Sequence, residues 1–126
     1  MYHFLERISL WTNIALRSRP SHEPNACSRQ YDLYCRDRRT ACPGGPVAKQ
    51  TADILTKIDD LLAAAGTRRE QAPDGHDLAR RHFFIRGMNR VWDNWVVPGS
   101  TPCRPCVEAR LAGAEYTVEI QITAAL

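Results

Sequence analysis

The strongest hydrophobic pattern in the chain runs from Gly45 to Gly66. Apolar and small side chains recur there every three or four residues, the spacing that places them on one face of an α-helix. That face consists of Val47, Thr51, Ile54, Leu55, Ile58, Leu61, Leu62 and Ala65, whereas Lys49, Gln50, Asp53, Lys57 and Asp60 are expected to face away. Gly66 can adopt the left-handed conformation that ends many helices. The pattern predicts a long amphipathic helix packed against the core.

A second, shorter helix is predicted within residues 87–99. Its apolar stripe consists of Met88, Val91, Trp92, Trp95 and Val96. Pro98 followed by Gly99 would stop the helix. Two tryptophans on such a stripe are more typical of a core or a subunit interface than of a ligand pocket.

The C-terminal stretch 114–126 alternates apolar and polar positions, which is the pattern of a β-strand with one buried face. Tyr116, Val118, Ile120 and Ile122 would point one way, and Thr117, Glu119, Gln121 and Thr123 the other. We expect residues 103–111 to form the partner strand, joined to the first through "LAGAE". On that partner, Arg104, Cys106 and Glu108 would share a face.

This order of elements predicts an α+β fold, with a mixed β-sheet and two helices packed on one face. The length of 126 residues suits a single domain over residues 1–126. Residues 30–39 show no apolar alternation, and residues 67–86 carry paired arginines where a strand should bury a face. We therefore expect the N-terminal strands and the strand between the helices to be degraded, with the regular pattern confined to 43–66 and 87–126.

The distribution of charge divides the chain in the same way. The net charge is +3 at pH 7, but residues 43–66 and 87–126 hold five basic and seven acidic groups, a balance of −2, which leaves +5 for the rest. A hydrophobic fraction of 44% and a charged fraction of 25% are ordinary for a soluble domain. No apolar run approaches the ~20 residues that span a bilayer. Without a recognisable export signal, the five cysteines are expected to be reduced and the protein to be cytoplasmic.

Residues 100–111, "STPCRPCVEARL", contain a C-x-x-C pair, which is a frequent half-site for zinc or a redox dithiol. On a strand, however, Cys103 and Cys106 would face opposite sides, because they are three positions apart. A redox dithiol would sit at a helix N-terminus instead. All the histidines, His3, His22, His76 and His82, lie in the irregular segments. We therefore expect no metal and no cofactor.

The regular segments resemble the RidA family, the YjgF-type reactive enamine/imine deaminases that are also described as L-PSP endoribonucleases. Residues 102–111, "PCRPCVEARL", match the family pattern P-A-R-x-x-V-E-x-A-R-L, and residues 116–125, "YTVEIQITAA", match the strand that follows it. Residues 50–66 and 88–99 fit the two family helices in order and spacing. The resemblance implies a chorismate-mutase-like fold, a homotrimer with sites between subunits, and no cofactor.

The resemblance also implies site residues and a reaction. It assigns Arg104 to hold the carboxylate of a 2-enamino or 2-imino acid such as 2-aminoacrylate, which suits a planar guanidinium. Glu119 would help to position the attacking water, Cys106 would line the pocket, and Asn89 matches a family residue whose role we leave open. Taken without the resemblance, Arg104 could instead form an interface salt bridge with Glu108 or Glu119, and a solvated strand carboxylate would be the favoured interpretation of Glu119.

Residues 1–42 and 67–86 break the resemblance, and one hypothesis covers both. Back-translated and read one nucleotide later, residues 30–39 permit "NTIYIAGTVA", and residues 68–85 permit the strand-like "DESKLLTATIWLADISSF". These segments would then be out-of-frame translation, which would also explain Cys27, Cys35 and Cys42.

Two other interpretations stay open. The pairs Arg38-Arg39, Arg68-Arg69 and Arg80-Arg81 could mark an RNA-binding protein or endoribonuclease, although the acidic balance of the regular segments disfavours a nucleic-acid partner. Alternatively, the chain could be an inactive frameshifted relative, because losing strands removes burial from a fold with only ~5–15 kcal/mol of net stability.

Overall fold

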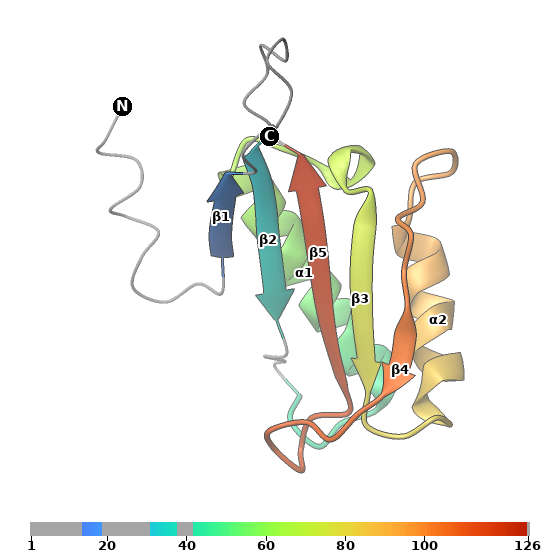
Figure 1. Ribbon diagram of the computed structural model, residues 1–126. Coiled ribbons are helices and arrows are strands. Elements are labelled where there is room, and N and C mark those ends of the chain that lie inside the picture. Colours follow the sequence, from blue (N-terminus) through green and yellow to red (C-terminus); the bar gives the residue numbers. More distant parts are fainter. Residues whose placement is uncertain (1–13, 19–30, 38–41, 126) are drawn as a thin grey trace, which may run out of the picture.

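The structure, a computed structural model, describes residues 14–18, 31–37 and 42–125. Within these ranges, five strands form one mixed sheet in the order β1-β2-β5-β3-β4, and helices α1 and α2 cover one of its faces (Figure 1). The elements are β1 (Ile14–Ser18), β2 (Tyr31–Asp37), α1 (Val47–Ala64), a 3₁₀ turn (Arg69–Gln71), β3 (Asp74–Ala79), α2 (Phe84–Trp95), β4 (Cys106–Glu108) and β5 (Val118–Ala125). The predicted α+β fold with two helices on one face of a mixed sheet is confirmed. In the described part of the chain, no helix has the length and apolar character needed to cross a membrane.

Helix α1 confirms the first predicted helix. Ile54, Ile58 and Leu62 are buried against the sheet, as their spacing predicted. Gly66 has a φ of +78°, and the amide of Thr67 donates to the carbonyl of Leu62, which together form the expected helix stop.

Gln50 corrects the predicted polar face of α1, because its side chain is fully buried rather than facing away. It lies at the start of the helix, where the chain before it and the loop before β5 close over the amide. The side chain donates to the carbonyl of Glu115 at 2.9 Å and accepts from the amide of Thr117 at 3.0 Å. Burial is possible because these backbone groups satisfy both ends of the amide.

Helix α2 begins three residues before the predicted stretch. Trp92 and Trp95 are both buried in the core cluster, so their interpretation as core residues is confirmed. The indole of Trp95 also donates to Asp59 of α1 at 3.0 Å, and Arg69 grips the same carboxylate. This arrangement locks the ends of the two helices together.

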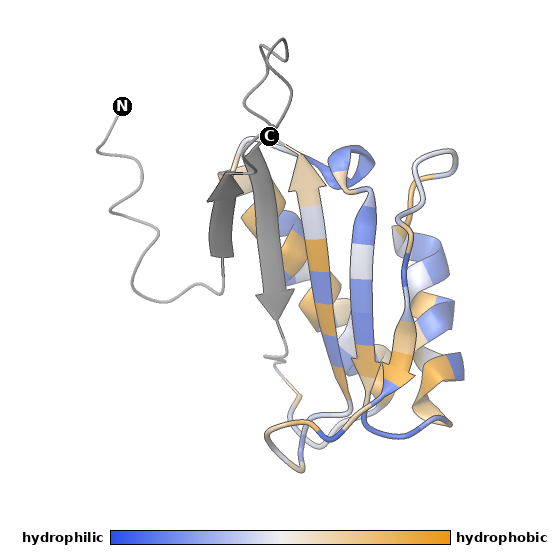
Figure 2. Cartoon of the chain, viewed as in Figure 1, coloured by the Kyte–Doolittle hydropathy of each residue, from blue (hydrophilic) through white to orange (hydrophobic). Residues whose placement is uncertain are grey.

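Strand β5 has the predicted alternation of apolar and polar residues, but Glu119 on its other face is buried too, with 3% exposed, so the alternative of a solvated carboxylate is wrong. Val118, Ile120 and Ile122 are fully buried beneath the helices, and hydrophobic and hydrophilic residues alternate along the strand in Figure 2. Because β5 is flanked by β2 and β3, both of its edges are hydrogen-bonded.

The predicted pairing of residues 103–111 with the C-terminal strand is wrong. Strand β4 is only three residues long and pairs in parallel with β3, which separates it from β5. The intervening helix α2 makes a parallel pair possible, because a crossover helix returns the chain to the same end of the sheet.

The expected loss of the strand between the helices is also wrong. Strand β3 lies inside residues 67–86 and is paired on both sides, although Figure 2 shows hydrophilic residues along most of it. Its core-facing positions are Gly75, Asp77 and Ala79, and a Cβ on Gly75 would lie 3.2 Å from Ile122. Small residues thus fit under the helices without an apolar alternation.

The N-terminal strands expected to be degraded are present as well. The backbone of β2 pairs antiparallel with β5, and β1 pairs with β2. Backbone hydrogen bonds form a ladder whatever the side-chain pattern, so weak patterning did not preclude a strand.

Candidate functional site

Arg104 is the centre of a polar cluster at the sheet edge formed by β3 and β4. The residue precedes β4, and its side chain turns toward the helices. One terminal nitrogen donates to Asp77 of β3, and the other donates to Asn89 of α2 at 2.8 Å. The guanidinium carbon lies 4.4 Å from the centre of the Trp92 ring. Only 13% of the Arg104 side chain is exposed, so the guanidinium is held in a fixed orientation.

Asp77 provides the negative charge of this cluster. Its side chain is completely buried, and its Oδ1 atom has no hydrogen-bond partner among the residues that the structure describes. Burial raises the pKa of the Asp77 carboxyl above its ordinary value of 3.8, and the hydrogen bond and charge of Arg104, followed by the charge of His76, oppose that rise. The ion pair therefore forms in a site that disfavours its anionic member.

The two cysteines lie in different surroundings. Cys106 is partly buried and packs against the core cluster, whereas Cys103 is exposed. Burial raises the pKa of the Cys106 thiol, the charge of Asp77 raises it further, and Arg104 lowers it. A neutral thiol is a poor nucleophile, which suits the pocket-lining role that the resemblance implies. Among the described residues, no three His, Cys, Asp or Glu side chains are grouped so that they could hold a metal ion.

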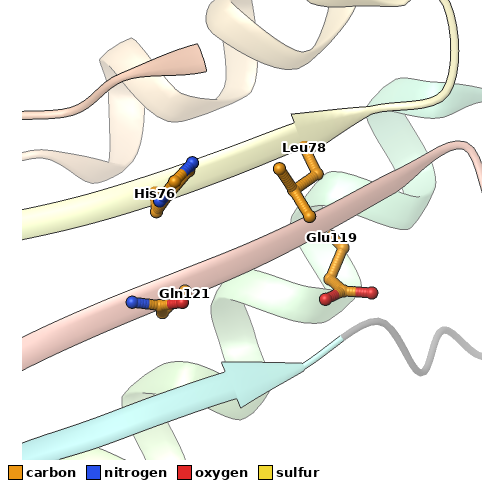
Figure 3. A pocket seen from close by; sticks show the side chains of 4 residues that line it. All are labelled: His76, Leu78, Glu119 and Gln121. Carbon is orange, nitrogen blue, oxygen red and sulfur yellow. The ribbon is translucent and has the colours of Figure 1, made fainter. Parts of the chain in front are cut away.

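Glu119 lies on the opposite face of the sheet from Arg104. Its neighbour in β5, Ile120, is fully buried under the helices, and successive strand residues face opposite sides. Glu119 lines a pocket with His76, Leu78 and Gln121, all projecting from β3 and β5 (Figure 3). The structure thus brings Arg104 and Asn89 into contact, with Cys106 close to the same ion pair, but separates Glu119 from them by the thickness of the sheet.

Sequence reasoning missed two members of the Arg104 cluster. Asp77 lies in a segment that we expected to be out of frame, and Trp92 was assigned to the core alone. The one local signal for Asp77 is its place in the series Gly75, Asp77, Ala79, where an acidic residue at a core-facing position requires a cation beside it.

The raised pKa of Asp77 predicts how stability depends on pH. Since the folded protein binds the Asp77 proton more tightly than the unfolded chain, this residue's contribution is most favourable below its ordinary pKa of 3.8 and is lost as the pH rises through the raised value. Urea unfolding of the native protein and Asp77→Asn between about pH 4 and pH 8 should show the native protein losing stability relative to the variant. A difference that is constant with pH would contradict the prediction.

Comparison with known proteins connects this geometry to a family. Residues 35–126 match the model of the family described as Endoribonuclease L-PSP, and the match runs through residues 67–86. A RutC family protein of Haemophilus ducreyi is 38% identical over 78 residues, which cover 62% of this chain and 67% of that relative. The RutC family protein YoaB of Escherichia coli is 37% identical over the same length and covers 62% of this chain and 68% of its own.

A solved structure agrees with these sequence matches. NMB1025 from Neisseria meningitidis, a member of the YjgF protein family, superposes with a TM-score of 0.70 at 35% identity, covering 88% of this chain and 94% of its own. Rv2704 from Mycobacterium tuberculosis, at 19% identity, has the same fold with a TM-score of 0.67 over 89% of this chain and 100% of its own.

Proposed function

The chain belongs to the Endoribonuclease L-PSP family, which includes the RidA, YjgF and RutC proteins, and on this premise we propose that it hydrolyses reactive 2-enamino and 2-imino acids. The products would be a 2-keto acid and ammonia. The reaction requires no cofactor, because the carbon–nitrogen double bond is already labile and needs only orientation and proton transfer.

The observation that carries this proposal is that Arg104 already binds a carboxylate, that of Asp77. Its guanidinium is oriented by Asn89 on one side and by the Trp92 ring on its face. Where a substrate displaces Asp77, a fixed, planar donor of this kind suits the carboxylate of a small imino acid, which it can bind through parallel charge-assisted hydrogen bonds. Cys106, beside the same ion pair, would line the pocket.

In the proposed reaction, the enamine first tautomerises to the imine. Water adds to the imine carbon and transfers a proton to the nitrogen, and the resulting carbinolamine collapses to the keto acid while the nitrogen leaves as ammonia. Glu119 is the proposed partner of the water. Because Glu119 and Arg104 face opposite sides of the sheet, one site can contain both only if it is completed by Glu119 of the partner subunit. The proposal therefore includes a homotrimer with shared sites.

The test is the release of keto acid from an imine generated in the assay. 2-Aminoacrylate, produced from serine by a dehydratase, would be partitioned between hydrolysis and a nucleophilic trap. We expect the protein to increase the pyruvate yield at the expense of the trapped product. If neither the native protein nor Asp77→Ile changes this partition, the proposed function is wrong.

Arg104→Lys provides the site-specific arm of that test. Lysine retains a positive charge for Asp77 but loses the planar fork, so turnover should fall about 10- to 100-fold, the equivalent of losing one charge-assisted hydrogen bond. Arg90→Lys, on the exposed surface of the same helix that carries Asn89, is the matched control and should retain full turnover. Equal turnover in Arg104→Lys would refute the assigned role of Arg104.

RNA binding or cleavage is the second candidate, supported by the family description and by the arginine pairs. Arg69 is already engaged by Asp59, and Arg80 donates to the carbonyl of Gly113, which reduces the support from two of these pairs. The pair at 38–39 lies outside the described residues. Absence of salt-dependent RNA binding would exclude this candidate.

The proposal has two further parts. One is the out-of-frame origin of residues 1–42 and 67–86, and the other is a cytoplasmic location. Gene sequence that forbids the alternative codons would refute the frame hypothesis, and so would an intact mass equal to that of the 126 residues in protein from its natural source. If the 126-residue sequence were confirmed and the protein also showed no turnover, the interpretation as an inactive relative of the family would be favoured.

A further inference from the structure

We propose that Asp77 is a specificity-determining residue of the Arg104 site, because it competes with a substrate carboxylate for the same guanidinium. This inference rests on the proposed function and adds a residue to it. It predicts that the native protein binds small carboxylates weakly. Removing the charge of Asp77 should allow Arg104 to bind them.

The first support is that both terminal nitrogens of Arg104 already have partners. One terminal nitrogen contacts Asp77, the other donates to Asn89 at 2.8 Å, and the Trp92 ring covers one face of the guanidinium. A carboxylate needs two parallel N–H groups to bind in bidentate fashion. An incoming carboxylate that used both terminal nitrogens would therefore compete with Asp77, the acceptor that carries the same charge.

The second support is that the backbone holds Arg104 beside Asp77. On either side of Arg104, the chain is tied to β3. The carbonyl of Cys103 accepts from the amide of Gly75 at 2.9 Å, and the carbonyl of Pro105 accepts from the amide of Asp77 at 3.1 Å. The backbone of Arg104 is thus held beside Asp77 by the pairing of this segment with β3, and the competition for the guanidinium is decided by the side chains.

The third support is that Asp77 is poorly accommodated. Its side chain is completely buried, and one of its oxygens, Oδ1, lacks a hydrogen-bond partner in the described part of the chain. A buried carboxylate with one unsatisfied oxygen gains its stabilisation mainly from Arg104. Asp77 contributes little to the core except this pairing, so replacing it with a neutral side chain of similar size should free Arg104. The alternative reading frame places an isoleucine at this position, and the competitor would then be absent.

The experiment is a calorimetric titration of pyruvate into the native protein, Asp77→Ile and Asp77→Asn. Both variants should bind pyruvate at least about 10-fold more tightly than the native protein, which is the effect of recovering one charge-assisted contact. Adding Arg104→Lys to Asp77→Ile should remove most of that gain. Asp93→Asn is the matched control, because it removes the same charge from the exposed surface of α2 and should leave affinity within about 2-fold.

Equal pyruvate affinity in the native protein and both Asp77 variants would overturn the inference. Asp77→Asn preserves the shape of the side chain, so this variant still tests the inference if Asp77→Ile does not fold. The native protein offers a measurement without any variant: pyruvate below about 1 mM should leave the NMR signals of the Arg104 guanidinium unchanged. Saturable binding at Arg104 in that range would equally overturn the proposal.

The failure of this inference can be distinguished from the failure of the proposed function. If Asp77→Ile binds pyruvate through Arg104 but does not hydrolyse the imine, the inference stands and the function is wrong. If the native protein hydrolyses the imine in an Arg104-dependent way and the Asp77 variants neither bind pyruvate more tightly nor turn over faster, the function stands and the inference is wrong.

Discussion

Replacing Arg104 with methionine should lower the free energy of unfolding by about 3–5 kcal/mol, because it leaves Asp77 as an uncompensated charge in the core. Asp77 is completely buried, and Arg104 is its main stabilising partner. Methionine preserves much of the volume of the arginine stem against Trp92, so the loss should come from electrostatics more than from packing. Urea unfolding at neutral pH, monitored by tryptophan fluorescence and circular dichroism, measures the change.

The double variant Asp77→Ile/Arg104→Met tests the cause. Replacing both members of a buried ion pair with apolar side chains is often neutral or stabilising, so the double variant should recover most of the lost stability. The control is Lys49→Met, which breaks a surface contact of 3.7 Å to Asp53 by a lysine with 61% of its side chain exposed, and should change stability by less than about 0.5 kcal/mol. A double variant as unstable as Arg104→Met would show that the isolated charge of Asp77 is not responsible.

The elements that could be predicted from the sequence are those whose hydrophobic periodicity alone identifies them as a helix or a strand. The helical spacing of Ile54, Ile58 and Leu62 and the alternation of Ile120 and Ile122 each describe a single buried face. Predicting such a face requires only that the protein has a core. It does not require knowing which element packs against the face. Helix α1 and strand β5 were therefore predicted correctly without knowledge of their partners.

Strands β3 and β4 could not be predicted in the same way, because their stability depends on neighbours that are distant in sequence. The core side of β3 carries Gly75 and Asp77, and neither residue favours a strand. Gly75 is suitable because Trp92 and Ile122 occupy the space above it, and Asp77 is tolerated because Arg104 reaches it. Both reasons become visible only when the chain is folded.

Some residues of the candidate site could be predicted from the sequence, but their arrangement in the fold could not. The family pattern identified Arg104, Asn89 and Cys106, and the fold places Arg104 and Asn89 in direct contact and Cys106 close by. The pattern contained no information on which face of the sheet Arg104 would use. Alternation within β5 fixed the side of Glu119 relative to Ile120, but the side chosen by Arg104 is set by Asp77, a residue of another strand.

Gln50 is a further residue whose role depends on tertiary structure. Its Nε2 group lies 3.3, 3.1 and 2.9 Å from the carbonyl oxygens of Cys42, Gly45 and Glu115. Its Oε1 atom accepts from both the amide and the hydroxyl of Thr117, each at 3.0 Å. One buried side chain thus connects the start of α1, the turn before it and the loop that leads into β5.

Gln50→Leu should therefore destabilise the fold by about 3 kcal/mol or more, because a side chain of similar size leaves several buried backbone groups without partners, at roughly 1–3 kcal/mol each. Urea unfolding measures the loss. Gln71→Leu provides the matched control, since Gln71 is exposed on the 3₁₀ turn and the same exchange there should stay within about 0.5 kcal/mol of the native protein. Hydrogen exchange gives a local readout: the amide of Thr117 should lose its protection in Gln50→Leu before the centre of β5 does, because it loses its acceptor directly. A stability within about 1 kcal/mol of the native value would mean that water replaces the amide at these positions and that Gln50 does not hold the loop to the helix.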